Sequence, residues 1–135
     1  FDWKPHEKSR TLELLASHVA ELPGFLNSIL TVDELDFAKG EYKAYKTKTP
    51  EELKDLFQER LDEVLQTLQN TSDEKMQETF TLRSGDHVIA SVPRMNAVRS
   101  MAFSHIVHHR GQLSVYLRLL DIPVPGMYGP SADEM

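Results

Sequence analysis

Residues 104–120 read SHIVHHRGQLSVYLRLL and place three histidines within five positions of what is otherwise the pattern of a buried helix. The apolar residues of this stretch recur at helical spacing. His105 and His109 share one helix face, whereas Phe103, just before the stretch, and Val107 lie roughly opposite. Because the helix is apolar on more than one side, we expect it to lie at the centre of the fold or at an interface.

The histidine pair has the spacing of metal ligands. His105 and His109 are four residues apart, so both imidazoles can reach one ion from a single helix face. His108 is turned by about 100° and does not share that face. The zincin motif is disfavoured, because Ile106 stands where that motif has the glutamate that acts as base. Histidines on an apolar face also occur as hydrogen-bonded core residues, so the spacing alone leaves both interpretations open.

A second helix brings in a third histidine. An apolar pattern covers residues 9–30 approximately, and His18 lies on its apolar face. Pro23 predicts a kink there, because its ring clashes with the carbonyl four residues earlier. Two apolar faces of one bundle meet in its core, so we expect His18 to approach His105 and His109. Three neutral imidazoles would suit a borderline-soft divalent cation such as zinc or nickel.

The clearest helix begins near residue 50. Thr49 is its expected N-cap, Pro50 takes the first helical position, and Glu52 completes a capping box with Thr49. Its apolar stripe consists of Leu53, Leu56, Phe57, Leu61, Val64, Leu65 and Leu68. The helical pattern fades at the polar sequence QNTSDE.

Two shorter features separate the long helices. Thr31 and Glu34 can form a capping box, which predicts a short helix that Gly40 ends. Between residues 78 and 92 the sequence ETFTLRSGDHVIASV alternates apolar and polar residues on both sides of an SGD turn. This alternation predicts a small β-hairpin, which we expect to lie on the helices because a lone hairpin is only marginally stable.

Composition limits the class of protein. The chain has 135 residues, 40% hydrophobic and 27% charged, which suits one globular domain over residues 1–135. A net charge of −6 disfavours sequence-independent nucleic-acid binding, and no apolar run reaches the length of a membrane span. The absence of cysteine excludes disulfides, cysteine zinc sites and a cysteine nucleophile. We therefore expect a cytoplasmic protein with neither nucleic acid nor membrane as its partner.

Three long helices suggest a bundle with one member missing. Four helices are the commoner closed arrangement of a bundle. The sequence begins FDWKPHEKS, without a methionine. We therefore expect an all-α, up-and-down four-helix bundle in which a first helix precedes Phe1, with the hairpin as a small insertion.

Four stretches of the chain resemble the DinB-like, DNA-damage-inducible family of small bacterial proteins. In chain order they are WKPHEKSRTLELLASHVAELPGFL, DFAKGEY, SHIVHHRGQLSVYLRLL and PVPGMYGPSADE. A histidine in the first stretch combined with H-x-x-x-H-R-G-Q in the third is more specific than either part alone. The resemblance implies an up-and-down four-helix bundle that binds a divalent cation through three histidines. These correspond here to His18, His105 and His109.

The resemblance also implies partners and chemistry. The family commonly forms homodimers, for which Phe103 and Val107 would be candidate contacts. Related proteins include thiol-dependent transferases and isomerases, so a small-molecule ligand or a low-molecular-weight thiol is an expected partner. Three protein ligands would leave a coordination position for water or substrate. Because the histidines are neutral, the ion would keep its full charge and remain a strong Lewis acid.

Several neighbours of the histidines are candidate site residues. Glu21 lies one turn after His18 and could act as a base or orient a ligand, although a solvated glutamate at the bundle edge fits the pattern equally well. Gln112 and Tyr116 lie near His109 on the helical wheel, so both could line a pocket. Tyr116 also suits a core position with its hydroxyl at the rim.

Other polar and aromatic residues have expected places outside the histidine group. Arg110 points away from the histidine face, which favours an ion pair or an interface over an anion clamp. His6 and His87 fall in connectors and should be solvated. Trp3 should pack on the end of the bundle, and Tyr128 in the tail could fold over the bundle mouth.

These observations support three functional hypotheses. The first is a metal-dependent hydrolase or thiol-dependent transferase. The second is a non-catalytic stress-response protein that binds a metal or small ligand, since the sequence has no evident general base or nucleophile. The third is a dimeric scaffold in which the histidines are hydrogen-bonded core residues.

Overall fold

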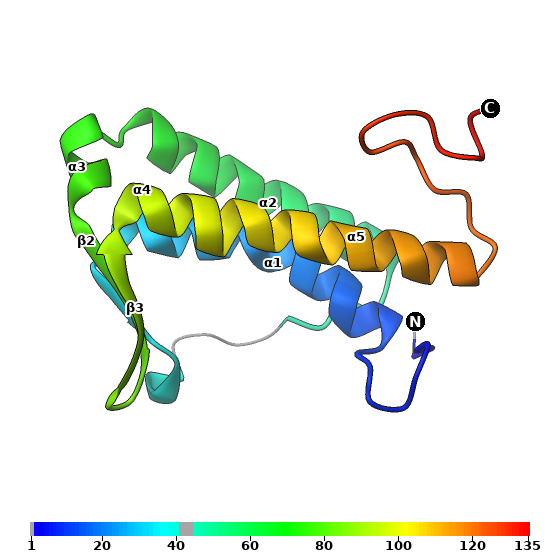
Figure 1. Cartoon of the computed structure of the whole chain (residues 1–135), viewed down its shortest axis with the longest axis horizontal. Helices are drawn as coiled ribbons and strands as arrows, with labels where there is room; N and C mark the ends of the chain where they lie inside the picture. Colours follow the sequence, from blue (N-terminus) through cyan, green and yellow to red (C-terminus); the bar gives the residue numbers. More distant parts are fainter. Residues whose placement is uncertain (1, 41–44) are drawn as a thin grey trace.

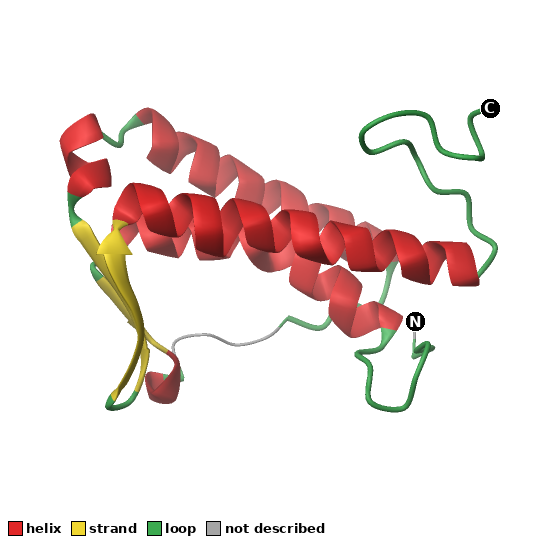
Figure 2. Ribbon diagram, viewed as in Figure 1, coloured by secondary structure: helices red, strands yellow, loops and turns green. Residues whose placement is uncertain are grey.

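Long helices run side by side, and a small sheet lies at one end of them (Figure 1). The computed structural model describes residues 2–40 and 45–135. The first two long helices are α1 (Leu12–Thr31) and α2 (Pro50–Gln69). The N-terminal loop and the C-terminal tail both lie at the end away from the sheet (Figure 2).

A third long helical stretch contains a change of helix type. It comprises α4 (Arg94–Ala97), the π-helical segment η2 (Val98–Phe103) and α5 (Ser104–Leu119), which follow one another without a break. At the end of η2 the backbone N–H of Ser104 donates to the carbonyl of Arg99, five residues earlier instead of four. The helix predicted over residues 104–120 is confirmed as α5, whereas the wider turn before it was not predicted.

Helix α1 packs against both other long helices. The hydroxyl of Thr11, its N-cap, accepts a hydrogen bond from the backbone N–H of Leu14 at 3.3 Å. The helix continues through Pro23, and the kink expected there stays a prediction. Its buried apolar residues are Leu15, Ala20, Leu22, Leu26, Ile29 and Leu30. The helix that carries His18 therefore also supplies a large share of the core.

The predicted start of α2 is confirmed, with one shift in its capping contacts. Thr49 accepts from the backbone N–H of Glu52 at 3.2 Å. The Glu52 carboxylate accepts from the backbone N–H of Lys48 at 2.6 Å, one residue earlier than a capping box requires. Where the pattern predicts only the end of α2, Ser72 caps a further short helix, α3 (Asp73–Gln77).

The segment after α1 is not the predicted short helix. Thr31 is the last residue of α1, and its hydroxyl donates to the carbonyl of Asn27 at 2.8 Å instead of capping a new helix. Strand β1 (Glu34–Asp36) and a 3₁₀ turn, η1 (Phe37–Lys39), follow. Pairing with a strand distant in sequence overrides the local capping signal. The end at Gly40 is confirmed, because its φ of 68° is the left-handed conformation that glycine adopts without strain.

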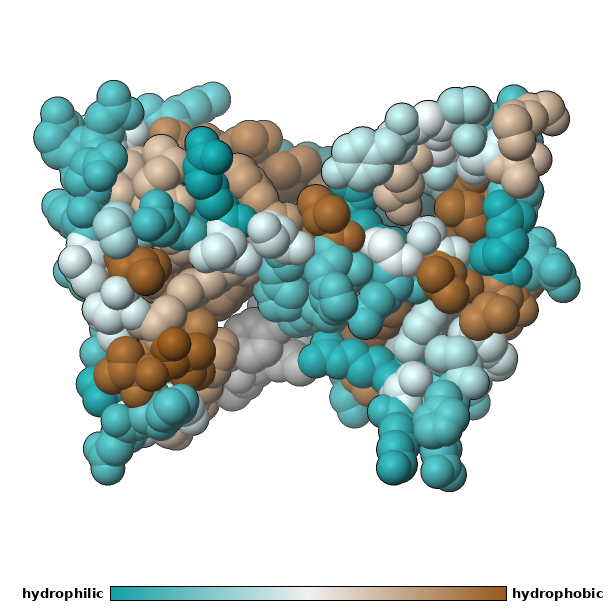
Figure 3. Space-filling view, viewed as in Figure 1, coloured by the Kyte–Doolittle hydropathy of each residue, from teal (hydrophilic) through white to brown (hydrophobic). Residues whose placement is uncertain are grey.

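The predicted hairpin is confirmed as part of a three-stranded sheet of order β1-β2-β3. Strand β2 (Thr79–Ser84) pairs antiparallel with β3 (His87–Pro93), and β1 pairs parallel with β2. Phe80 and Leu82 of β2 are buried in the core cluster, so the sheet packs on the helices as expected. Strand β3 carries exposed apolar side chains, which form a patch over the hairpin in Figure 3.

The all-α class therefore needs one correction, since the chain is mostly helical but its sheet has three strands, one of them parallel. The third strand comes from the segment that local signals assigned to a helix. None of the described helices combines the length and the hydropathy that a membrane crossing needs.

A buried arginine joins the sheet end of α1 to the start of α4. Arg94 is 0% exposed. Its guanidinium donates to the backbone carbonyls of Ile29 and Val32, the second at 2.7 Å, and to the Asp33 carboxylate at 2.7 Å. The last carbonyls of a helix have no partner within the helix. A charged side chain from another element therefore supplies the C-terminal hydrogen bonds of α1.

Candidate metal centre

Three histidines from two helices converge in the structure. His18 lies on α1, and His105 and His109 lie one turn apart on α5. Their ring centroids are 4.6 to 5.1 Å apart, and one ligand atom of each lies within 4.8 Å of the others. The closest approach is 3.3 Å, between Nε2 of His18 and Nε2 of His105. The expected convergence is confirmed, and the group could hold a metal ion.

The π-helical segment η2 ends immediately before the two histidines of α5. A π turn inserts an extra residue into the helical repeat, so it rotates the residues after it relative to those before it. Val98 and Ala102 within η2 are buried in the core, whereas His105 and His109 face His18. The wider turn therefore lets one helix pack its first part into the core and still direct two imidazoles at α1.

Glu21 fixes the ring of His18 and is itself held in place. Its Oε1 lies 2.7 Å from Nδ1 of His18, and its Oε2 accepts from the backbone N–H of Tyr45 at 3.1 Å. One turn earlier, Ser17 Oγ accepts from the backbone N–H of Thr47 at 3.1 Å. Glu21 is 4% exposed, so it is not the solvated glutamate that the sequence also allowed. Its contacts support the role of orienting a ligand.

The two histidines of α5 have partners of their own. Nδ1 of His109 lies 2.7 Å from Oε1 of Gln112, and His105 hydrogen-bonds to the backbone of Met101, one turn earlier. An oxygen acceptor keeps a proton on the ring nitrogen that faces it. The other nitrogen of the ring is then left with a lone pair, which is the form that binds a metal.

The facing nitrogens have the chemistry of a cation site. With Glu21 accepting from His18, and the Met101 carbonyl accepting from His105, the two Nε2 atoms face each other at 3.3 Å as lone pairs. Two lone pairs at this distance repel unless a cation or proton lies between them. Two imidazoles that bind one tetrahedral ion at about 2.0–2.1 Å have nitrogens roughly 3.4 Å apart. The residues present therefore fit a divalent metal ion.

Burial keeps the histidines of α5 neutral. It lowers the pKa of His109 to about 4, and repulsion from a charge on His18 acts in the same direction. The pKa of His105 is also lowered, first by burial and then by His18. Neutral imidazole is the form that coordinates a metal, so both side chains are ready to bind at pH 7.

The metal-free protein should lose stability as the pH falls from about 6.5 towards 4. In the unfolded chain His109 takes up a proton near its ordinary pKa of 6.5, whereas the folded protein resists protonation until about 4. Protonation therefore favours unfolding, so this contribution is complete above pH 6.5 and is lost as the pH falls through 4. We expect the thermal midpoint of chelator-treated protein to drop between pH 7 and 5, and to drop less in His109→Asn. Equal drops in the two proteins would contradict this assignment.

Replacing Glu21 should weaken metal binding without removing a ligand. Loss of a residue that orients a metal ligand typically costs about 10- to 100-fold in affinity. We expect Glu21→Ala to show this loss for zinc in a competition titration with a chromophoric chelator, and Glu21→Gln, which keeps an acceptor oxygen, to show less. Glu59→Gln on α2, where the side chain is 61% exposed, is the matched control and should bind like the wild type. Wild-type affinity in Glu21→Ala would show that the carboxylate does not act on the site.

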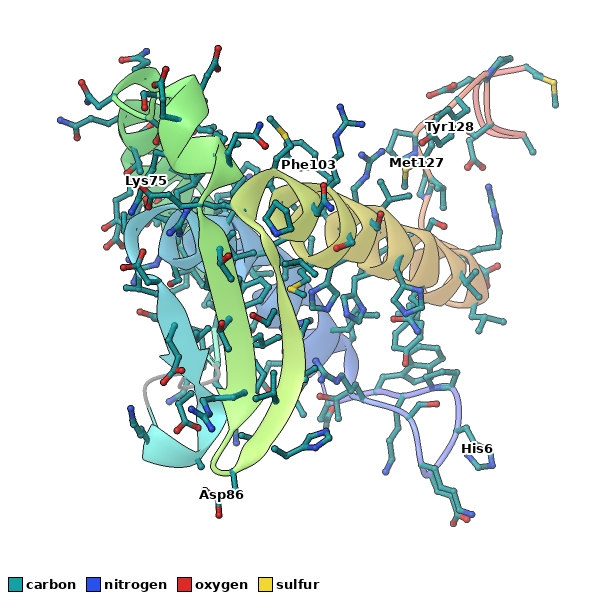
Figure 4. All side chains as sticks on the ribbon, turned by 60° about the vertical axis from the view of Figure 1, so that its left-hand side comes forward. His6, Lys75, Asp86, Phe103, Met127 and Tyr128 are labelled. Carbon is teal, nitrogen blue, oxygen red and sulfur yellow. The ribbon has the colours of Figure 1, made fainter. Side chains whose placement is uncertain are left out.

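The remaining histidines lie outside the group, as predicted. His108 is exposed, with its ring 4.8 Å from that of His109 but turned to a different face. His6 lies on the loop before α1 (Figure 4), where its Nδ1 accepts from the backbone N–H of Lys8 at 3.1 Å. His87 is exposed at the first position of β3, so it belongs to a strand and not to the predicted connector.

Tyr116 contacts the N-terminal loop. Its hydroxyl donates to the carbonyl of Arg10 at 3.1 Å, and its ring meets Trp3 edge-on at 5.6 Å between centroids. The expected packing of Trp3 is confirmed, and the hydroxyl of Tyr116 lies at the rim, as one of the two interpretations predicted. A role for Gln112 or Tyr116 in lining a pocket stays a prediction.

The tail lies beside α5. Tyr128 is 93% exposed there (Figure 4), so it is not folded over the bundle. The guanidinium of Arg110 lies 3.0 Å from Sδ of Met127, which agrees with a structural role for this arginine. Arg118 anchors the tail through two hydrogen bonds to the carboxylate of Asp133, at 3.0 and 2.6 Å.

Comparison with known proteins identifies a family and a solved structure of similar fold. The family model described as the DinB family matches residues 1–135. A crystal structure of a DinB-like protein from Bacillus subtilis is similar with a TM-score of 0.67 and 22% sequence identity, over 97% of this chain and 83% of that chain. No curated protein matches the sequence. The resemblance carried by the four sequence stretches is thereby confirmed.

Proposed function

The chain belongs to the DinB family, and we propose that it is a metal-dependent enzyme of the hydrolase or thiol-dependent transferase type. In this proposal His18, His105 and His109 hold one zinc or nickel ion. The observation that carries it is the convergence of three imidazole ligand atoms within 4.8 Å of one another. The oxygen partners of the rings support it, because they leave a lone pair on each imidazole for the ion.

A bound divalent ion would supply Lewis acidity, which lowers the pKa of a coordinated water or thiol. The protein would supply position and protonation state. Glu21 would hold the ring of His18 from the buried side, and Gln112 would do the same for His109. With three protein ligands, a small molecule or a low-molecular-weight thiol would have room to approach the remaining coordination positions.

A second function is favoured by the state of Glu21. Both of its oxygens are engaged, one by His18 and the other by the backbone N–H of Tyr45, so this carboxylate is poorly placed to accept a proton from substrate. The alternative is therefore a non-catalytic stress-response protein that binds a metal or a small ligand.

One experiment separates the two functions. Protein loaded with zinc, and separately with nickel, is assayed with low-molecular-weight thiols plus electrophiles, and with panels of esters and amides. Turnover that disappears in His109→Ala supports the enzyme. A fully metal-loaded protein with no turnover in any panel supports the non-catalytic alternative.

We also propose that the chain forms a homodimer through exposed apolar residues of η2 and α5. Phe103, the last residue of η2, and Val107, Val115 and Leu119 of α5 are each about half exposed, and apolar side chains are visible along this stretch in Figure 3. We expect Val107→Glu to shift the wild-type dimer to a monomer in analytical ultracentrifugation. A wild type that is monomeric at all concentrations would contradict the proposal.

The four-helix arrangement is likewise a proposal. Helices α2 and α5 both pack on α1. On α2, Phe57 and Leu65 remain partly exposed, which would suit the contact surface of a fourth helix.

A further inference from the structure

A cleft of about 410 Å³ opens beside the histidine group, within the usual size range of small-molecule sites. Its apolar walls come from four elements of the fold. Phe25 belongs to α1, Phe37 to η1, Leu82 to β2 and Met101 to η2. The sheet is thus part of the cleft, which gives a role to the strands that lie at this end of the helices.

The polar side chains that line the cleft come from η2 and α5. His105 and His108 are two of them. Two serines also line it, but their hydroxyls are used within the helix: Ser100 donates to the carbonyl of Asn96 at 2.7 Å and Ser104 to that of Arg99 at 3.1 Å. None of the described residues that line the cleft carries a carboxylate, an ammonium or a guanidinium group.

One imidazole belongs to both the cleft and the histidine group. The ring of His105 stands at 90° to that of Phe25, with centroids 6.2 Å apart, while its Nε2 lies 3.3 Å from Nε2 of His18. The cleft therefore lies next to the place at which the three histidines would hold an ion. The π-helical segment places Met101 on the wall of the same cleft.

We infer that the cleft binds the uncharged, apolar part of a small ligand whose metal-binding head group reaches the three histidines. The inference rests on the proposed function and names its substrate class: an aryl or branched alkyl group joined to a head such as a thiolate or a hydroxamate. Apolar burial supplies the affinity, and the ion sets the orientation.

Two hydroxamic acids with the same head group test the inference. Zinc-loaded protein is titrated by calorimetry with acetohydroxamic acid and with benzohydroxamic acid. We expect the phenyl compound to bind at least about tenfold more tightly, because its ring is removed from water by the cleft walls. We call this ratio of dissociation constants the aryl preference.

Substitutions of residues that line the cleft test whether the aryl preference arises there. Ser104→Phe should fill the cleft and reduce the aryl preference to about one, with zinc and acetohydroxamate binding unchanged. Phe37→Ala, on a partly exposed wall, should reduce it about threefold. Ser114→Phe is the matched control, because the Ser114 hydroxyl also donates to its own helix, at Gly111, but this residue does not line the cleft. It should keep the full preference.

The possible outcomes separate the inference from the proposed function. If wild-type protein holds zinc and binds both hydroxamates equally, the inference is overturned and the metal site stands. The same holds if neither Ser104→Phe nor Phe37→Ala changes the aryl preference. If the protein holds neither zinc nor nickel, the proposed function fails, and the inference fails with it.

Discussion

Replacing His109 by alanine is expected to reduce the bound metal from about one ion per chain to a small fraction of that value. The substitution removes one of three converging imidazoles, and two ligands from separate helices do not hold a tetrahedral ion at micromolar concentrations. The reason is specific to this fold, because His105 and His109 lie on one helix and His18 on another, so only two of the three would remain to hold the ion. Metal content of protein purified without an affinity tag, in zinc-replete and nickel-replete medium, measures the effect.

The loss should also appear as lost stabilisation by the ion. An ion present at about 100 times its dissociation constant stabilises the folded state by about 2.7 kcal/mol, and this increment disappears when the site is lost. His108→Ala is the matched control, since this exposed histidine is the neighbour of His109 in sequence but lies outside the group. It should keep full occupancy. Full occupancy in His109→Ala would refute the three-histidine site, and a wild type with less than one ion per several chains would support the structural interpretation.

Arg94→Ala should be the most destabilising single substitution outside the histidine group. It leaves a cavity in the core, and it leaves the carbonyls of Ile29 and Val32 without their guanidinium partner. An unsatisfied buried polar group costs about 1–3 kcal/mol, and the lost packing of the side chain adds to this. We expect the free energy of unfolding to fall by about 3–5 kcal/mol in urea titrations.

Two controls identify the cause. Arg99→Ala removes an exposed arginine from the same helical stretch and should change stability by less than about 0.5 kcal/mol. Asp33→Asn removes the charge partner of Arg94 but keeps a hydrogen-bond acceptor, and Asp33 is 76% exposed, so the cost should be small. A loss below about 1 kcal/mol in Arg94→Ala would mean that water satisfies the two carbonyls.

The histidine group could be predicted from the sequence because helical periodicity is a local property. The spacing of His105 and His109 fixes their shared face, and the apolar residues around His18 direct it to the core. Two helices that each have an apolar face pack with these faces together, which brings His18 close to His105 and His109. The partners of the rings were partly visible for the same reason: Glu21 and Gln112 each lie three residues after a histidine.

The misses share a different cause. Strand β1 exists because Leu35 pairs with Leu82, 47 residues later, and no local signal reports such pairing. Thr31 and Glu34 have the spacing of a capping box, but the pairing of β1 with β2 places Glu34 in a strand, so the box does not form. The π turn of η2 was missed because the choice between a four-residue and a five-residue hydrogen bond depends on the packing of Val98 and Ala102 in the core. The cleft beside His105 could not be predicted, since its walls come from four separate elements.

Glu21 connects helix α1 to residues 45–47, the linker that precedes α2, and this connection couples metal binding to the conformation of the linker. One oxygen contacts the ring of His18 and the other holds the main chain at Tyr45, while Ser17 holds Thr47 nearby. Metal binding at the histidines and the ordering of residues 45–47 are therefore coupled. If a bound ion stabilises the ordered segment by some free energy, the ordered segment strengthens metal binding by the same free energy. A molecule that displaced this linker would act as a competitor of the metal without touching any of its ligands.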